Sequence, residues 1–365
     1  MIKVLMISRA TLFSSPGGDT VQVEETANYL RKIDVVVDIK LSNEIIDFKG
    51  YDLVHFFNII RPNDILGHLK RISIPFVIST IFVDYTEYEL KVRKGVLGVL
   101  SKLTSSDFIE YLKVVARALK NGEKIGHYSY LIYGHKKSVK KIISKAACLL
   151  PNSESEYQRL IEHYGIEREY QVIPNALNVN KFLSTKTTEL KKETVICVAR
   201  IEGVKNQLNL IKALADTNFK LIIIGSPSPN NLAYYERCKN AAGKNTSFIS
   251  HLKQDELVAY YSNAKVHILP SWFETTGLSS LEAGYLGCNL VVTDKGDVKE
   301  YFKDFATYCN PEDLNSIKEA VTKAYELVNN DNLKNYILEN FTWDITAKKT
   351  KEAYLKVLSK TKVDD

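Results

Sequence analysis

Short apolar runs alternate with amphipathic helical patterns along both halves of the chain. In the first half, strands are predicted at residues 3–8, 35–41, 52–57, 76–80 and 147–151, and helices at 20–33 and 154–164. The second half restarts this rhythm, with strands predicted at residues 194–198, 220–224, 246–249, 266–269 and 289–293. Helices are predicted between them at residues 206–214, 232–242, 255–262 and 278–286. This alternation is typical of α/β proteins whose parallel sheets are covered by helices on both faces.

Two such sets in 365 residues predict two doubly wound domains, because the chain is longer than one typical core. A polar stretch between residues 178 and 192 interrupts the pattern, so we expect the domains to span residues 1–178 and 179–345. In such folds ligands bind at the carboxyl ends of the strands and in the cleft between domains.

The composition is that of an ordinary globular protein, with 45% apolar and 25% charged residues. No apolar run reaches the length of a membrane span, and the run at residues 1–8 is too short for a signal peptide. The five cysteines show no metal-ligand spacing and predict reduced, buried thiols. We therefore expect a cytoplasmic location.

Positive charge is concentrated in one part of the chain. Residues 91–145 hold 13 Lys and Arg against 3 Asp and Glu, whereas the net charge of the whole chain is +6. Apolar residues recur at helical spacing in the same stretch. Basic amphipathic helices suit an anionic membrane surface or an anionic lipid-linked substrate, and a solvated basic face is the alternative. We expect no nucleic-acid partner.

One motif carries most of the chemistry. The strand predicted at residues 266–269 runs into a Pro-Ser turn, then Glu274, then small residues that open a helix; Glu282 follows eight positions after Glu274. A helix N-terminus presents N–H groups and partial positive charge to an anion. An anion there, with two carboxylates to hold hydroxyl groups, describes a site for a sugar attached to a phosphate. The alternative is a helix-terminus carboxylate and an unrelated surface Glu.

Two further loops could contact a ligand. Arg200 and Lys205 bracket the loop that follows the strand at 194–198, where they would clamp a diphosphate unless they are only surface cations. After the first strand, Gly17 and Gly18 allow close approach to the backbone, and a plain turn is the alternative. The glycines do not form a G-x-G-x-x-G motif, so no dinucleotide is inferred.

The chain resembles the retaining glycosyltransferases of the two-domain GT-B type, family GT4. The resemblance covers nearly the whole chain, strongly over residues 148–300 and weakly over residues 60–145. The segments that carry it are residues 151–156, 172–177, 200–205, 221–225, 248–252, 270–283 and 341–347. It implies two Rossmann-like domains facing a central cleft, with the acceptor on the first, the donor on the second, and a C-terminal helix at 346–365 packed back on the first.

The resemblance also implies roles for individual residues. It assigns the donor diphosphate to Arg200, Lys205, Gly17, Gly18, Leu278 and Ser279. It assigns the donor sugar to Glu274, Thr275, Thr276 and Gly277. It assigns the ribose and the base to Glu282, His251 and Leu252.

The chain departs from the family in one place. Many relatives carry a His after the strand that matches residues 76–80, and this sequence has none there. Asp84 is our candidate substitute, stabilising developing positive charge or orienting the acceptor, and a loop or helix-capping role is the alternative. His55, Phe57 and Asn58 are further candidates for residues that face a ligand.

The predicted function is transfer of a sugar, with retention of configuration, from a nucleotide-diphosphate sugar to a hydroxyl of a glycan or lipid-linked acceptor. Cell-surface polysaccharide or glycolipid synthesis at the inner face of the membrane would fit the basic stretch. We expect no metal and no cofactor, since there is no Asp-x-Asp triplet and the histidines lack ligand spacing. The alternatives are a nucleotide-sugar epimerase, a phosphorylase on the same fold, or a catalytically silent nucleotide-binding scaffold.

Overall fold

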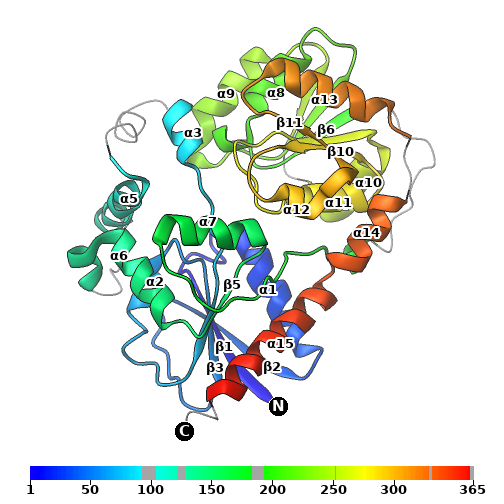
Figure 1. The fold of residues 1–365 in the computed structure, drawn as a ribbon. Helices are drawn as coiled ribbons and strands as arrows, with labels where there is room; N and C mark the ends of the chain where they lie inside the picture. The colour runs from blue at the N-terminus through cyan, green and yellow to red at the C-terminus, as the bar shows by residue number, and fades with distance from the viewer. Residues whose placement is uncertain (93–103, 122–127, 183–192, 251, 329–330, 362–365) are drawn as a thin grey trace. The chain divides into compact units, whose positions relative to one another are not determined.

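The computed structural model describes residues 1–92, 104–121, 128–182, 193–250, 252–328 and 331–361 (Figure 1). The chain forms two compact units, and each of them is discontinuous in sequence. The first comprises Met1–Phe82, Lys94–Asn175 and Trp343–Asp365, and the second comprises Val83–Arg93 and Ala176–Thr342. The segment Val83–Arg93 thus belongs to the second unit, whereas the sequence-based division placed it in the first.

The first unit is built on a parallel sheet. Its strands run in the order β2 (Val35–Leu41), β1 (Ile2–Ser8), β3 (Leu53–Phe57), β4 (Phe76–Ser79) and β5 (Cys148–Leu150). Every residue of β3 and β4 is buried. Such continuously buried strands are expected where both faces of a parallel sheet are covered.

Helices from distant parts of the chain complete this unit. They are α1 (Gly18–Arg31), α2 (Pro62–Leu66), α5 (Ser106–Asn121), α6 (Ser129–Lys145), α7 (Glu154–Tyr164) and α15 (Trp343–Thr361). The short helix α2 was not predicted. Helix α6 bends at Gly134, whose φ of +70° a residue with a side chain rarely adopts.

The C-terminal helix α15 packs on α1, as the resemblance implied (Figure 1). Thr346 donates a hydrogen bond to the carbonyl of Pro174 at 2.8 Å, and Lys351 donates to the carbonyl of Ile33 at 2.6 Å. The predicted return of the chain to its first unit is confirmed.

The second unit is also built on a parallel sheet. Its strands run in the order β11 (Ala306–Cys309), β10 (Asn289–Thr293), β9 (Val266–Leu269), β6 (Thr194–Val198), β7 (Lys220–Ile224) and β8 (Thr246–Ile249). Side chains of successive residues point to opposite faces of a strand, so Leu290 and Val292 enter one core cluster and Val291 the other. The expected α/β architecture is confirmed in both units.

The helices of the second unit cover both faces of its sheet. They are α3 (Thr86–Lys91), α8 (Gln207–Leu214), α9 (Leu232–Ala241), α10 (Gln254–Asn263), α11 (Leu278–Tyr285), α12 (Val298–Phe302), α13 (Leu314–Glu326) and α14 (Asn332–Asn340). Short 3₁₀ turns lie at Val179–Phe182, Gly203–Lys205, Pro229–Asn231 and Lys303–Phe305.

The cysteines are all buried and none forms a disulfide. Burial raises the pKa of Cys148 and of Cys238 to about 11, so these thiols stay protonated at neutral pH. Within the described ranges, no helix is long and apolar enough to cross a membrane.

Candidate active site

The loop after β9 holds Glu274 in a fixed position. The backbone of Glu274 pairs with Gly296, and its carbonyl accepts a hydrogen bond from the amide of Asp297 at 2.9 Å. Gly296 has a φ of +89°, and a Cβ there would lie 2.1 Å from the carbonyl oxygen of Glu274. Only glycine fits this contact, so the backbone on the Gly296 side holds the loop in place, and the Glu274 side chain is 11% exposed.

Lys205 and Glu274 form a direct ion pair. The Nζ atom of Lys205 donates to Oε2 of Glu274 at 2.6 Å, and the hydroxyl of Ser271 donates to the same oxygen at 3.1 Å. Both residues follow neighbouring strands, β6 and β9, whose carboxyl ends meet at one edge of the sheet. Burial lowers the pKa of Lys205, but the charge and hydrogen bond of Glu274, together with Tyr85 and Glu202, raise that pKa above its usual value. The amine is therefore a cation held against a carboxylate.

The turn that carries Lys205 is fixed by its next residue. Asn206 adopts a left-handed conformation with a φ of +62°. Its side-chain amide donates to the carbonyl of Pro270 at 3.1 Å and to that of Pro311 at 2.7 Å. These bonds tie the turn to the loop that leads into Glu274.

Helix α11 begins immediately after this loop. Gly277 precedes it with a φ of +67°, and its carbonyl accepts hydrogen bonds from the amides of Ser280 at 2.8 Å and Leu281 at 3.1 Å. Amides of a first helical turn have no acceptor within the helix, so this terminus favours an anion. Thr276 is buried, whereas Thr275, Leu278 and Ser279 are partly exposed.

Arg200 presents its guanidinium to solvent near the same strand edge. Its side chain is 59% exposed and lies 3.5 Å from a carboxylate oxygen of Glu202. The carbonyl of Arg200 accepts a hydrogen bond from the side chain of Gln207 at 2.9 Å, which fixes its backbone. The exposed guanidinium can therefore turn toward an anion and donate two parallel hydrogen bonds to it.

Glu282 lies on α11, where it accepts a hydrogen bond from the hydroxyl of Tyr261 at 3.0 Å. Burial raises the pKa of Glu282 to about 7, although the Tyr261 bond and the charge of Lys181 act in the opposite direction. This carboxyl group therefore changes its charge near neutral pH. The separate roles expected for Glu282 and Glu274 stay predictions.

The predicted base-binding residues are described only in part. Leu252 is partly exposed in the connection between β8 and α10. His251 lies outside the described residues, so its assignment stays a prediction.

In the first unit, the Gly17-Gly18 loop is shaped by an arginine that the sequence analysis did not single out. The guanidinium of Arg9 binds Asp19 through two bonds of 2.5 and 3.0 Å and donates to the carbonyl of Ser15 at 2.9 Å. A Cβ at Gly18 would meet no atom within 4 Å. Internal packing therefore does not require a glycine there. An arginine directly after the first strand, ten residues before an aspartate, was the available signal.

The structure bears on two further candidate residues. The carboxylate of Asp84 accepts a hydrogen bond from the amide of Thr86 at 2.9 Å, in the turn before α3, which fits the loop or helix-capping alternative; its catalytic role stays a prediction. His55 is buried, with its ring nitrogens 2.6 Å from the Tyr354 hydroxyl and 2.9 Å from the Ser79 hydroxyl. Burial lowers the pKa of His55 to about 3, so it is neutral and has a packing role instead of the ligand-facing role expected.

Among the residues that the structure describes, no three His, Cys, Asp or Glu side chains lie together as a metal-binding group. Independence of metal remains a prediction.

Known proteins share this fold and part of this sequence. Residues 178–340 match the family model described as Glycosyl transferases group 1. The D-inositol 3-phosphate glycosyltransferase of Nocardia farcinica is 24% identical over 189 residues, and the match covers 46% of this chain and 42% of that protein.

Solved structures match over nearly the full length. The sucrose-phosphate synthase of Thermosynechococcus elongatus has a TM-score of 0.72 at 14% identity, with 98% of this chain and 100% of that one covered. Anabaena HepE in complex with UDP and glucose has a TM-score of 0.66 at 14% identity, with 97% and 99% covered.

These matches show the fold of the chain and a family match over part of it. The chain has the GT-B fold, and its residues 178–340 match the model of the group 1 glycosyl transferases. The chain spans about two fifths of the length of the first curated relatives that it matches.

Proposed function

We propose that this protein is a retaining glycosyltransferase that moves a sugar from a nucleotide-diphosphate sugar to a hydroxyl of a glycan or lipid-linked acceptor. The observation that carries the proposal is the Lys205–Glu274 pair, which lies directly before the N-terminus of α11. A cation, a carboxylate and a helix terminus suit the phosphate and the sugar hydroxyls of one extended ligand.

When the donor binds, Lys205 and Glu274 separate and each contacts a part of the donor. Lys205 turns to the diphosphate, and the Glu274 oxygen that it occupied accepts a hydrogen bond from a sugar hydroxyl instead. Arg200 adds a planar fork to the phosphates, and the amides of Leu278 and Ser279 face the distal phosphate. These fixed charges stabilise the departing nucleotide while the sugar passes through an oxocarbenium-like transition state.

In this proposal Glu282 holds the ribose, and the segment around His251 and Leu252 holds the base. As a carboxylate, Glu282 accepts hydrogen bonds from the ribose hydroxyls. HepE was solved with UDP and glucose, so UDP-glucose is the first donor to test. A hydroxyl next to an anionic group is a reasonable acceptor, since the Nocardia relative is named for inositol 3-phosphate.

The test is a transfer assay with Glu274→Gln. Purified protein is incubated with UDP-glucose, GDP-mannose or ADP-glucose and a membrane lipid extract, and transferred sugar is measured. We expect transfer by the wild type and its loss in Glu274→Gln. Glu236→Gln on α9, whose side chain is 59% exposed, is the matched control and should keep full transfer. Epimerised sugar in the absence of acceptor would support the epimerase alternative instead.

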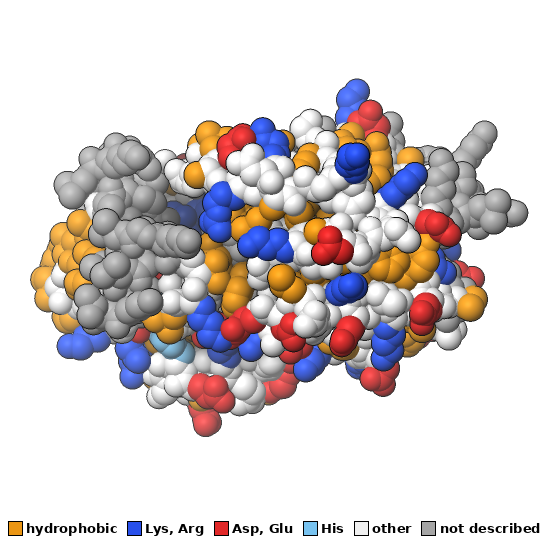
Figure 2. Space-filling view, turned by 90° about the horizontal axis from the view of Figure 1, so that it is seen from above, with side chains coloured by type: hydrophobic (Ala, Val, Ile, Leu, Met, Phe, Trp, Pro, Cys, Tyr) orange, Lys and Arg blue, Asp and Glu red, His pale blue; other side chains and the backbone are white. Residues whose placement is uncertain are grey.

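We also propose that the first unit binds an anionic membrane surface through α5 and α6, at the cytoplasmic face. Large apolar side chains are exposed there, including Ile132 at 71% and Tyr128 at 65%. In Figure 2 hydrophobic side chains gather at the left edge, the side on which Figure 1 draws these helices. Exposed apolar patches rimmed by charge are typical of interaction surfaces.

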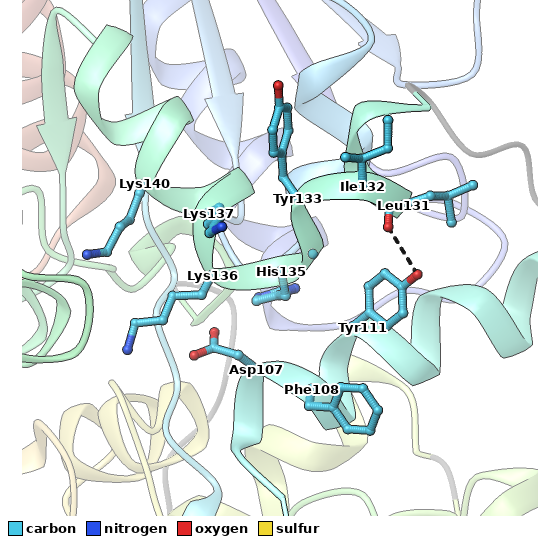
Figure 3. Close-up of a pocket in the computed structure, with 11 residues that line it drawn as sticks. Asp107, Phe108, Tyr111, Leu131, Ile132, Tyr133, His135, Lys136, Lys137 and Lys140 are labelled. Carbon is cyan, nitrogen blue, oxygen red and sulfur yellow. Dashed lines mark hydrogen bonds between the residues drawn. The ribbon is translucent and has the colours of Figure 1, made fainter.

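Lysines accompany these apolar side chains. A pocket of about 630 Å³ lies between α5 and α6, with Phe108 and Leu131 on its apolar side and Lys136, Lys137 and Lys140 on the next turns of α6 (Figure 3). Apolar groups that enter the lipid and lysines that meet its phosphates are the combination found in interfacial helices. A lipid-linked acceptor would reach the enzyme at such a surface.

Vesicle sedimentation tests this part of the proposal. We expect the protein to sediment with vesicles containing anionic phosphatidylglycerol and not with phosphatidylcholine alone. Ile132→Ser and Lys136→Glu should each weaken binding, and Lys323→Glu in the second unit serves as the control. Equal binding to both kinds of vesicle would contradict the proposal.

A further inference from the structure

The second unit contains a segment contributed by the first half of the sequence. Val83–Arg93, which includes α3, belongs to this unit, and we call it the strap. Lys91 of the strap forms an ion pair with Glu312, and Glu87 lies 3.4 Å from the amine of Lys295. Two ion pairs to separate loops fasten the strap at its helical end.

An aromatic contact fastens the middle of the strap. The hydroxyl of Tyr88 lies so close to Gly203 that a Cβ on this glycine would be 2.0 Å from it. The ring of Tyr88 also lies 6.4 Å from that of Trp272, measured between centroids. Gly203 belongs to the Arg200–Lys205 loop, so the absence of a side chain there makes room for the strap. This is a structural reason for a glycine at this position.

These anchors place Tyr85 beside the charged pair. Its ring meets that of Phe273, the neighbour of Glu274, edge-on with 6.3 Å between centroids. Its phenol lies within electrostatic range of Lys205, Glu274 and Arg200, and the residue as a whole is 38% exposed. Burial raises the pKa of Tyr85, with the charge of Lys205 opposing and that of Glu274 adding. The phenol therefore keeps its proton at neutral pH and is a hydrogen-bond donor.

We propose that the strap is part of the donor site and that Tyr85 donates its phenolic hydrogen to an oxygen of the donor's distal phosphate. When Lys205 leaves Glu274 for the diphosphate, this neutral donor supplements the cation without adding charge. The inference rests on the proposed function, because it concerns the same ligand. It adds a residue for which the sequence pattern gave no signal.

Binding of UDP-glucose, UDP and UMP to Tyr85→Phe tests the inference by calorimetry. The guanosine or adenosine set replaces these probes if the wild type prefers that base. We expect Tyr85→Phe to bind UDP-glucose and UDP about tenfold more weakly, as for loss of a hydrogen bond to a charged group, with UMP binding unchanged. Tyr235→Phe on α9 keeps wild-type affinity for all three.

The other possible outcomes contradict either the role of Tyr85 or the proposed function. Unchanged UDP binding by Tyr85→Phe overturns the role of Tyr85, and so does an equal loss of UMP binding, because UMP has no distal phosphate. If the wild type binds none of the nucleotide sugars, the proposed function fails and the inference fails with it.

A second variant tests the anchor. Tyr88→Ala removes the contact at Gly203 and should reproduce the selective loss of UDP binding. The double variant Tyr85→Phe/Tyr88→Ala should lose no more than Tyr88→Ala alone, because both changes act through one hydroxyl. Independent, additive losses would show that the strap does not act by positioning Tyr85.

Discussion

The amine of Lys205 lies 2.6 Å from a carboxylate oxygen of Glu274, although the two are 69 positions apart in sequence. The pair exists because β6 and β9 are neighbours in the sheet and both loops leave from the same edge. Two residues with separate expected ligands are therefore partners of each other, and in our proposal donor binding has to compete with their ion pair.

This relationship predicts a non-additive result for the pair. Lys205→Met should reduce transfer about 10²–10³-fold, the usual cost of losing one fixed donor at a developing charge. It should also lower the free energy of unfolding by about 1–3 kcal/mol, because Glu274 is left buried without its cation. Adding Glu274→Gln should restore stability but not activity. Urea unfolding and transfer assays of the single and double variants check both statements.

The carboxyl group of Glu282 predicts a pH dependence of donor binding. Its pKa is about 7, so it is largely protonated at pH 6 and ionised at pH 8. Only the ionised group accepts hydrogen bonds with both oxygens, so donor affinity should rise through this range. Calorimetry at several pH values should show the rise in wild type and a flat profile in Glu282→Gln.

The same shift predicts the sign of a stability effect. The folded state raises the pKa of Glu282 from 4.5 to about 7, so folding favours the protonated form. The stability that protonated Glu282 contributes to the folded state is therefore lost as the pH rises from about 4.5 to about 7. The wild type should lose more stability than Glu282→Gln over this window. A larger loss in the variant would contradict the assigned environment.

Gly296 predicts a coupled loss of stability and activity. With a φ of +89° and Glu274 directly behind it, Gly296→Ala should destabilise the fold by about 1–3 kcal/mol and displace the carboxylate. Gly50→Ala is a matched control, since Gly50 has a φ of +77° but no neighbour within 4 Å of a Cβ. It should cost stability by backbone strain alone and leave transfer intact. Thermal unfolding and transfer assays distinguish the two variants.

The contact between His55 and Tyr354 predicts a purely structural effect. Tyr354→Phe leaves a buried ring nitrogen without its partner and should cost about 1–3 kcal/mol of stability. The affinity of the folded variant for the donor should not change. A loss of donor affinity in this variant would give His55 the ligand-related role that its burial argues against.

The alternation of strands and helices was predictable because it depends on local periodicity. The strands at residues 194–198, 220–224, 246–249, 266–269 and 289–293 occur where the apolar runs place them. After Thr293, the C-terminal helix was the one helix that the sequence analysis expected. The register of the other helices depends on tertiary contacts that a short window does not contain.

The candidate site was predictable only as separate motifs. Spacing located Glu274, Lys205 and the start of α11, because each follows a strand end. Their ion pair depends on strand order, which the sequence does not state. Tyr85 was missed for the same reason, since the loop beside it comes from another part of the chain. Arg9 was missed although its partner Asp19 lies only ten residues away.

Calorimetric titration of the wild type and Glu274→Gln with UDP-glucose, GDP-mannose and ADP-glucose tests the central claim most directly. We predict that the wild type binds one of these donors and that Glu274→Gln binds it at least tenfold more weakly while keeping affinity for the matching nucleoside diphosphate. Binding of no donor by the folded wild type, or equal donor affinity in the variant, would contradict the account.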